Sequence, residues 1–131
     1  MKIKLRKLDE INSHKQKLAK LYFDHLDHSF IKPVIQENFT DVFHIFNIRH
    51  QKRDALRAYL LENGVKTEIH YPIPPHQQEG YKYLFRNQHF LISETIHDTT
   101  LSLPISSCHS EKDIEQVVGV MNKFITKFQF L

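Results

Sequence analysis

Three of the five prolines in this chain lie within eight residues, in the segment 69–76 with the sequence IHYPIPPH. Proline has no backbone N–H to donate to a sheet and is poorly tolerated inside a helix, so neither element can run through this segment. The chain must therefore build its strands and helices on the two sides of a stiff loop. That loop also carries two histidines, His70 and His76.

The part of the chain before the loop predicts a helix, a strand and a second helix. Apolar residues recur every three or four positions over residues 5–27, which is typical of a long amphipathic helix. Residues 42–49, VFHIFNIR, are rich in aromatic and β-branched side chains, which favours a strand buried on both faces. A helix is expected over residues 51–63, and Gly64 follows where a left-handed cap residue belongs.

Strict alternation over residues 65–71, VKTEIHY, predicts a half-buried strand that Pro72 ends. Lys66, Glu68 and His70 share the polar face of this strand. After the loop we expect short helices over 77–85 and 93–98, the second opened by Ser93, and then a strand over 100–105.

The last helix is marked at its start and along one side. Ser110, followed three residues later by Asp113, resembles a weak capping box. One apolar stripe then follows at helical spacing: Ile114, Val117, Val118, Met121, Ile125 and Phe128. The order of elements indicates a two-layer α+β fold, with a small, mostly antiparallel sheet of about three strands and helices against one face.

The predicted first helix raises a question about the surroundings of the fold. A chain of 131 residues has the size of one domain, and the strand and helix units after residue 40 could form a core without this helix. Its broad apolar stripe is therefore expected to need a further surface to cover it.

Charge and hydropathy limit the partners. Residues 1–20 hold seven cations and two anions, but no aromatic side chains interleave with them, so we interpret the cluster as a solvated helix face and expect no nucleic-acid partner. No apolar run is long enough to cross a bilayer and the N-terminus lacks the apolar core of a secretion signal, so no membrane partner is expected. A single cysteine, Cys108, fits a reducing cytoplasm and is expected to be partly buried.

The usual cofactor and metal motifs cannot be built from this sequence. Three glycines do not allow a phosphate-binding glycine loop, and ten histidines form neither HExxH nor a zinc pattern. His44 is interpreted as a hydrogen-bonded core histidine. Ser106, Ser107 and His109 do not establish a catalytic triad, so no catalytic residue, cofactor-binding residue or metal ligand is predicted.

The proline loop is the best candidate for a binding site. His70 lies at the end of a strand that leads into a rigid loop, a common position for ligand contacts. Tyr71, His76 and Tyr81 follow on the same segment and add imidazole and phenol groups that bind hydroxyls or phosphates. The alternative is a loop that is rigid for structural reasons only.

The segment RHQKRDALRAYLLENGVKTEIHYPIPPHQQEGY resembles the C-terminal part of the DegT/DnrJ/StrS sugar aminotransferases, which are pyridoxal-phosphate (PLP) enzymes of aspartate-aminotransferase fold. The resemblance extends over about residues 5–126. The shared features are an Arg-x-x-Leu helix, a glycine before a short strand, a His-Tyr-x-Pro-x-His loop and a following tyrosine. They correspond here to Arg53, Leu56, Leu60, Gly64, His70, Tyr71, Pro72, Pro74, His76 and Tyr81.

The resemblance implies a substrate site and a missing part. It places His70, Tyr71, His76 and Tyr81 where a nucleotide sugar enters the cleft, for amino transfer from glutamate to a keto-sugar nucleotide in lipopolysaccharide or other surface-glycan synthesis. Residues 1–28 correspond to the helix that links the large and small domains, and 40–131 to the small α+β domain. The large domain, with the lysine that binds PLP covalently, has no counterpart in this sequence.

We therefore expect this chain alone to bind no PLP and to be inactive. It would be a segment of a longer protein, a truncated product, or a subunit that needs a separately made PLP-binding large domain. The apolar stripe of the first helix would be covered by that domain or by self-association. The rival interpretations are a stand-alone ligand-binding or regulatory α+β module and a nucleic-acid binder.

Overall fold

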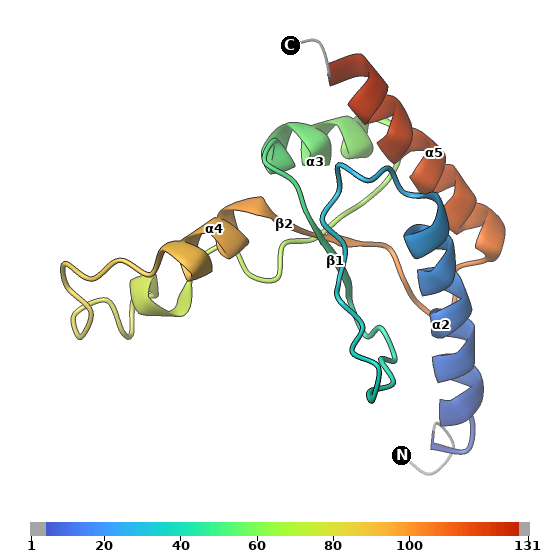
Figure 1. The fold of residues 1–131 in the computed structure, drawn as a ribbon, viewed down its shortest axis with the longest axis horizontal. Helices are drawn as coiled ribbons and strands as arrows, with labels where there is room; N and C mark the ends of the chain where they lie inside the picture. The colour runs from blue at the N-terminus through green and yellow to red at the C-terminus, as the bar shows by residue number, and fades with distance from the viewer. Residues whose placement is uncertain (1–4, 129–131) are drawn as a thin grey trace.

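The structure is a computed structural model that describes residues 5–128. Two short strands lie at its centre, with long helices on one side and an extended arm on the other (Figure 1). The elements, in chain order, are α2 (Leu8–His25), β1 (Phe46–Arg49), α3 (Arg53–Glu62), the 3₁₀ turn η1 (Pro75–Gln77), α4 (Leu91–Thr99), β2 (Thr100–Leu103) and α5 (Glu111–Phe128). The fold is α+β with a long N-terminal helix, as the sequence predicts.

The sheet consists of β1 and β2, which pair antiparallel with Phe46 opposite Leu103 and Arg49 opposite Thr100. The expected strand over 42–49 is shorter, and the prediction that both of its faces are buried is wrong. Phe46 and Ile48 are fully buried, but the alternate residues of β1 are only half-buried because they face away from the core. His44 precedes the strand and is exposed, so it is not a core histidine.

The third predicted strand is reduced to a single bridge. The backbone of residues 65–71 pairs with β2 only where Glu68 and Ser102 form two hydrogen bonds of 3.2 and 2.8 Å. The predicted alternation holds in part: Val65 and Thr67 are buried, whereas Tyr71 is exposed. The chain leaves the sheet after the bridge because the prolines that follow cannot extend a ladder. Gly64, with φ of +79°, adopts the predicted left-handed conformation.

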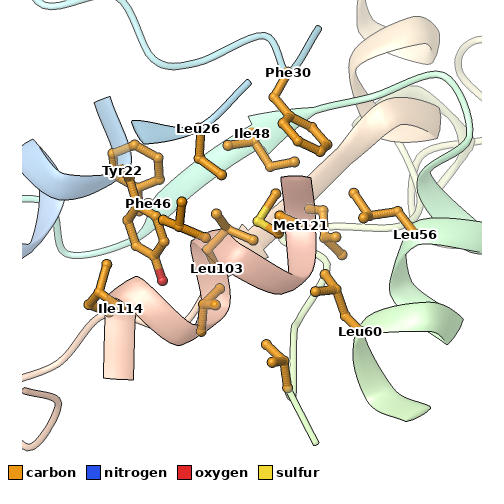
Figure 2. Packing of buried hydrophobic residues seen from close by; sticks show 14 of the residues in the cluster. Tyr22, Leu26, Phe30, Phe46, Ile48, Leu56, Leu60, Leu103, Ile114 and Met121 are labelled. Atoms are coloured by element: carbon orange, nitrogen blue, oxygen red, sulfur yellow. The ribbon is translucent and has the colours of Figure 1, made fainter. Parts of the chain in front are cut away.

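The core lies where α2, α3 and α5 cover the sheet, with side chains of all these elements converging on Phe46 and Met121 (Figure 2). The rings of Tyr22 and Phe46 lie 4.7 Å apart, and the Tyr22 hydroxyl donates a 2.7 Å hydrogen bond to the carbonyl of Pro104. Burial raises the pKa of Tyr22 above its ordinary value, so this phenol remains a neutral donor.

The apolar stripe of α2 is covered largely by the chain itself, so the expectation that it needs an outside surface is wrong over its C-terminal half. Leu18, Ala19 and Tyr22 are fully buried. At the end of the helix, Asn122 of α5 accepts a hydrogen bond from the N–H of Asp27 and donates one to the carbonyl of His25. Only the first turns of the helix retain exposed leucines.

Three further predictions fail for local reasons. Residues 77–85 form no α-helix, because after η1 the chain continues in turns. α4 begins at Leu91 rather than at Ser93, and the Glu94 carboxylate accepts a hydrogen bond from the N–H of Phe90 at its start. Cys108 is exposed rather than partly buried.

The predicted capping box at the last helix is confirmed. The Asp113 carboxylate accepts a hydrogen bond of 2.8 Å from the N–H of Ser110, and the Ser110 hydroxyl accepts one of 3.2 Å from the N–H of Asp113. This reciprocal pair satisfies backbone donors that a helix start leaves without partners. The boundary of α5 is therefore encoded locally.

Candidate functional site

Residues 70–99, here called the arm, hold all the predicted binding residues. The arm leaves the sheet after the Glu68 bridge, passes through η1 and a series of turns, and returns along α4 to β2 (Figure 1). No residue of α4 is buried. Most large apolar side chains of the arm are exposed: Tyr71, Ile73, Tyr81, Tyr83, Leu84, Phe90, Leu91, Ile92 and Ile96.

His70 lies at the base of the arm and is joined to both strands. Its Nδ1 lies 2.9 Å from the hydroxyl of Ser102 on β2, and that hydroxyl donates a 3.2 Å hydrogen bond to Oδ1 of Asn47 on β1. Ser102 is buried and stands opposite Asn47 in the strand pairing. The sheet therefore holds the ring of His70 at a defined position while the residue itself stays exposed.

Tyr71 is anchored through its backbone and leaves its ring free. The Tyr71 carbonyl accepts a hydrogen bond from Nδ1 of His97, near the end of α4. The ring stands edge-on to the His70 ring at 5.6 Å, and the residue is 67% exposed. Its phenol is therefore accessible to a ligand.

His76 is buried and already engaged. Its Nε2 lies 3.0 Å from Oε1 of Glu94, and the N–H of Phe90 donates to the same oxygen at 3.0 Å. The hydrogen bond from Phe90, followed by that from His76, lowers the pKa of Glu94, so this carboxylate stays charged. The ring of His76 also packs on that of Phe90, with the ring centres 4.8 Å apart.

Tyr81 and His76 meet in one pocket. An open pocket of about 460 Å³ is lined almost entirely by apolar atoms of Pro75, His76, Tyr81, Phe85, Phe90 and Ser93. The structure thus brings His76 and Tyr81 together in the arm, while His70 and Tyr71 lie at its base. An apolar, aromatic wall of this kind suits a planar ring or the apolar face of a sugar.

Arg53, the first residue of α3, has a role that the sequence analysis did not assign. The buried guanidinium donates from Nη1 to the carbonyls of His97 and Thr100, both at 3.1 Å, and from Nε to Asp54. It therefore ties the end of α4 to the core. Its spacing of three and seven residues before Leu56 and Leu60 is the signal that could have placed it on the inner side of the helix.

Ser102, Asn47, Glu94 and His97 were also missed. Each acts on a predicted residue from a distant part of the chain, and no local motif marks any of them. In the described part of the chain, no group of three or more histidine, cysteine, aspartate or glutamate side chains is placed to hold a metal ion. No helix among residues 5–128 is long and apolar enough to cross a membrane.

The lysines do not fit the role of a covalent PLP anchor. A lysine that reacts as a nucleophile at neutral pH needs a desolvated ammonium in a closed site. Among residues 5–128 every lysine is exposed except the half-buried Lys15 and Lys32. Lys32 donates to the carbonyls of Phe23 and Leu26, both at 2.9 Å, and Lys15 lies 3.4 Å from the carbonyl of His44.

Solved structures of larger proteins share this fold. The chain superposes on S. venezuelae DesV with a TM-score of 0.90 and 28% identity, over 94% of this chain and 34% of that one. It also matches ntda from Bacillus subtilis, which was solved with the bound cofactor PMP, with a TM-score of 0.73 and 25% identity over 87% of this chain and 29% of that one. The chain therefore has the fold of about a third of each of these larger proteins.

The sequence comparisons specify the family. The chain is 38% identical, over 125 residues, to dTDP-3-amino-3,6-dideoxy-alpha-D-galactopyranose transaminase of Aneurinibacillus thermoaerophilus, covering 95% of this chain and 34% of that protein. The model of the DegT/DnrJ/EryC1/StrS aminotransferase family matches residues 1–122, and the chain belongs to this family. It spans about a third of the length of the curated relatives that it matches.

Proposed function

We propose that this chain is the substrate-binding small domain of a nucleotide-sugar aminotransferase, spanning residues 1–131 with the linking helix at 1–28. The observation that carries this proposal is its 38% identity, over 95% of its length, to a relative named as a dTDP-amino-sugar transaminase. The reaction is amino transfer from glutamate to a keto-sugar nucleotide, in the cytoplasm, for lipopolysaccharide or another surface glycan. PLP, held elsewhere, supplies the electron sink for that transfer.

The predicted binding residues of the arm have two different roles. His70 and the phenols of Tyr71 and Tyr81 are accessible and contact the sugar nucleotide. His76 is buried against Phe90 and Glu94, so it shapes the apolar pocket rather than bonding to the ligand through Nε2. These interactions bind and orient the substrate, and none of them moves a proton in the chemical step.

A separate large domain completes the enzyme. The support for this is the exposed apolar surface of the arm together with that of residues 31–45, where Val34 is 90% and Phe39 71% exposed. Surfaces of this kind are rare on free monomers. The exposed lysines agree with a cofactor site supplied by another polypeptide or by a longer form of this one, so the chain alone is inactive. Self-association is the alternative cover for these surfaces.

A chimaera tests the proposal. The matching third of the Aneurinibacillus relative is replaced by this chain, and transamination of a dTDP-linked keto sugar is measured by the release of 2-oxoglutarate. We expect the chimaera to be active, and this chain alone to leave the absorbance of added PLP unchanged and to release none. Tyr81→Phe should raise KM several-fold in the chimaera, whereas Tyr83→Phe, a neighbouring exposed tyrosine, should not.

The opposite results separate the rivals. A folded chimaera without activity, together with tight sugar-nucleotide binding by this chain alone in calorimetry, would favour the stand-alone module. Equal effects of Tyr81→Phe and Tyr83→Phe on KM would contradict a substrate site at Tyr81 in the arm. Steeply salt-dependent binding of DNA or RNA would contradict the predicted lack of a nucleic-acid partner.

A further inference from the structure

The hydrogen-bond chain at the base of the arm defines the protonation of His70. Ser102 has one hydroxyl proton, and it donates this proton to Oδ1 of Asn47 at 3.2 Å. Only lone pairs of the Ser102 oxygen remain for the second contact, the 2.9 Å approach of His70 Nδ1. His70 must therefore be the donor in that contact, so its neutral ring carries the proton on Nδ1 and leaves Nε2 as a bare acceptor.

A second serine–histidine pair in the same chain lacks this constraint. Ser106 Oγ lies 2.9 Å from Nδ1 of His109, the same separation as in the first pair. Here the serine oxygen accepts a hydrogen bond from the N–H of Cys108, so its own proton is free to point at the histidine. The contact with His109 can therefore run in either direction, whereas the bond from Ser102 to Asn47 fixes the direction of the contact with His70.

The two strands make this arrangement rigid. Asn47 and Ser102 face each other in the β1–β2 pairing, and the backbone of Ser102 also pairs with Glu68, two residues before His70. Ser102 is buried, so water does not compete readily for its hydroxyl. Among the residues that the structure describes, none bonds to Nε2 of His70, and the residue is exposed on the arm.

We propose that Ser102 and Asn47 are positioning residues that hold His70 in the Nδ1–H form and present its Nε2 as a hydrogen-bond acceptor. A bare nitrogen accepts from a hydroxyl or an N–H group and repels the oxygens of a phosphate, which at neutral pH are acceptors. His70 therefore selects a sugar hydroxyl rather than the phosphate of the substrate. The choice of ligand rests on the proposed function, whereas the protonation state of His70 does not.

Nitrogen NMR of the 131-residue chain tests the protonation state directly. With ¹⁵N-labelled histidine at about pH 8, where an ordinary imidazole of pKa ~6.5 is neutral, the two ring nitrogens give distinct shifts according to which one bears the proton. The His70 signals are assigned by their loss in His70→Asn. We expect Nδ1 of His70 to be protonated in the wild type.

Variants of the two positioning residues should change the position of the His70 proton in predictable ways. Ser102→Ala should transfer the proton largely to Nε2, while Ser102→Thr, which retains the hydroxyl, should preserve the wild-type pattern. Asn47→Asp keeps an acceptor for Ser102 and should also preserve it. Ser106→Ala is the matched control and should alter only His109. A wild-type His70 protonated on Nε2 overturns the proposal, and this result needs no variant to fold.

A titration of the chimaera with the same labelled histidines, in which the large domain completes the site, tests the ligand. A dTDP-linked hexose should shift the Nε2 resonance of His70 in the wild type, and inorganic phosphate should not. A shift caused by phosphate alone would overturn the selection of a hydroxyl. If neither probe moves the resonance while Nδ1 is protonated, the substrate contact assigned to His70 fails and its positioning by Ser102 and Asn47 stands.

Discussion

The core and the arm contain similar apolar side chains, but only the core buries most of them. In the core, Leu56, Phe46 and Met121 are fully buried by neighbours from three helices and two strands. In the arm, Leu91 and Ile92 are 74% and 80% exposed, and its order depends on isolated hydrogen bonds from Arg53, His76 and His97. The core is stabilised by its own packing, whereas the arm leaves most of its large apolar side chains exposed.

The largest expected effect contrasts two leucines. Leu56→Ala should lower the free energy of unfolding by about 2–5 kcal/mol, because it removes a fully buried side chain and leaves a cavity. Leu91→Ala, the same change in the arm, should alter it by less than about 0.5 kcal/mol. Urea unfolding followed by circular dichroism measures both. Equal losses would mean that the arm is part of the cooperative core.

The link between the two regions is the next target. Arg53→Met should cost about 1–3 kcal/mol, because the carbonyls of His97 and Thr100 lose their buried donor. It should also speed the proteolytic cleavage of the arm before the core unfolds. Arg57→Met, on the exposed side of the same helix, is the control and should do neither. An unchanged cleavage rate would contradict the anchoring role of Arg53.

Tyr22 makes the stability of the core depend on pH in the alkaline range. Its folded-state pKa is raised by burial, so above pH 10 the folded protein retains a proton that the unfolded chain releases. The free energy of unfolding should therefore be unaffected by this group below pH 10 and fall above it, by up to ~1.4 kcal/mol per pH unit. Tyr22→Phe should remove this part of the fall and cost about 1 kcal/mol at pH 7 through the lost bond to Pro104. Chemical unfolding of both proteins at several pH values measures this difference in the free energy of unfolding.

The smallest effect on global stability is expected within the arm. Glu94→Ala removes the acceptor for His76 and for the N–H of Phe90, so the Phe90 amide should exchange faster with solvent. Because the pKa of Glu94 is lowered in the folded chain, its contribution is present above pH 4.5 and is lost as the pH falls through the folded-state value. Glu79→Ala, an exposed neighbour, is the control. A large loss of core stability in Glu94→Ala would contradict the separation of the two regions.

Much of the fold was predictable because its signals are local. The stripe of α5, the capping box of Ser110 and Asp113, and the left-handed Gly64 each depend on residues a few positions apart. The strand over 65–71 failed as a full strand although its alternation held over Val65 and Thr67. Alternation reports which way side chains point, and it does not report whether a partner strand continues alongside.

The site was predicted less completely for the same reason. The proline loop identified the arm and its four binding candidates, but their partners are far away in the chain. Ser102 lies 32 residues from His70 and 55 from Asn47, and Arg53 lies 44 residues from His97. No spacing rule connects such positions before the sheet has formed.

The sequence by itself determined where α5 begins, which sides of the helices are apolar, and where prolines force the chain out of the sheet. These follow from backbone geometry and from side-chain periodicity within one or two turns. Only the tertiary structure decided that His44 is exposed, that α2 is covered by α5, and that Ser102 joins His70 to Asn47. Those outcomes depend on which distant surfaces meet when the core closes, and burial and hydrogen bonding across the sheet are set at that step alone.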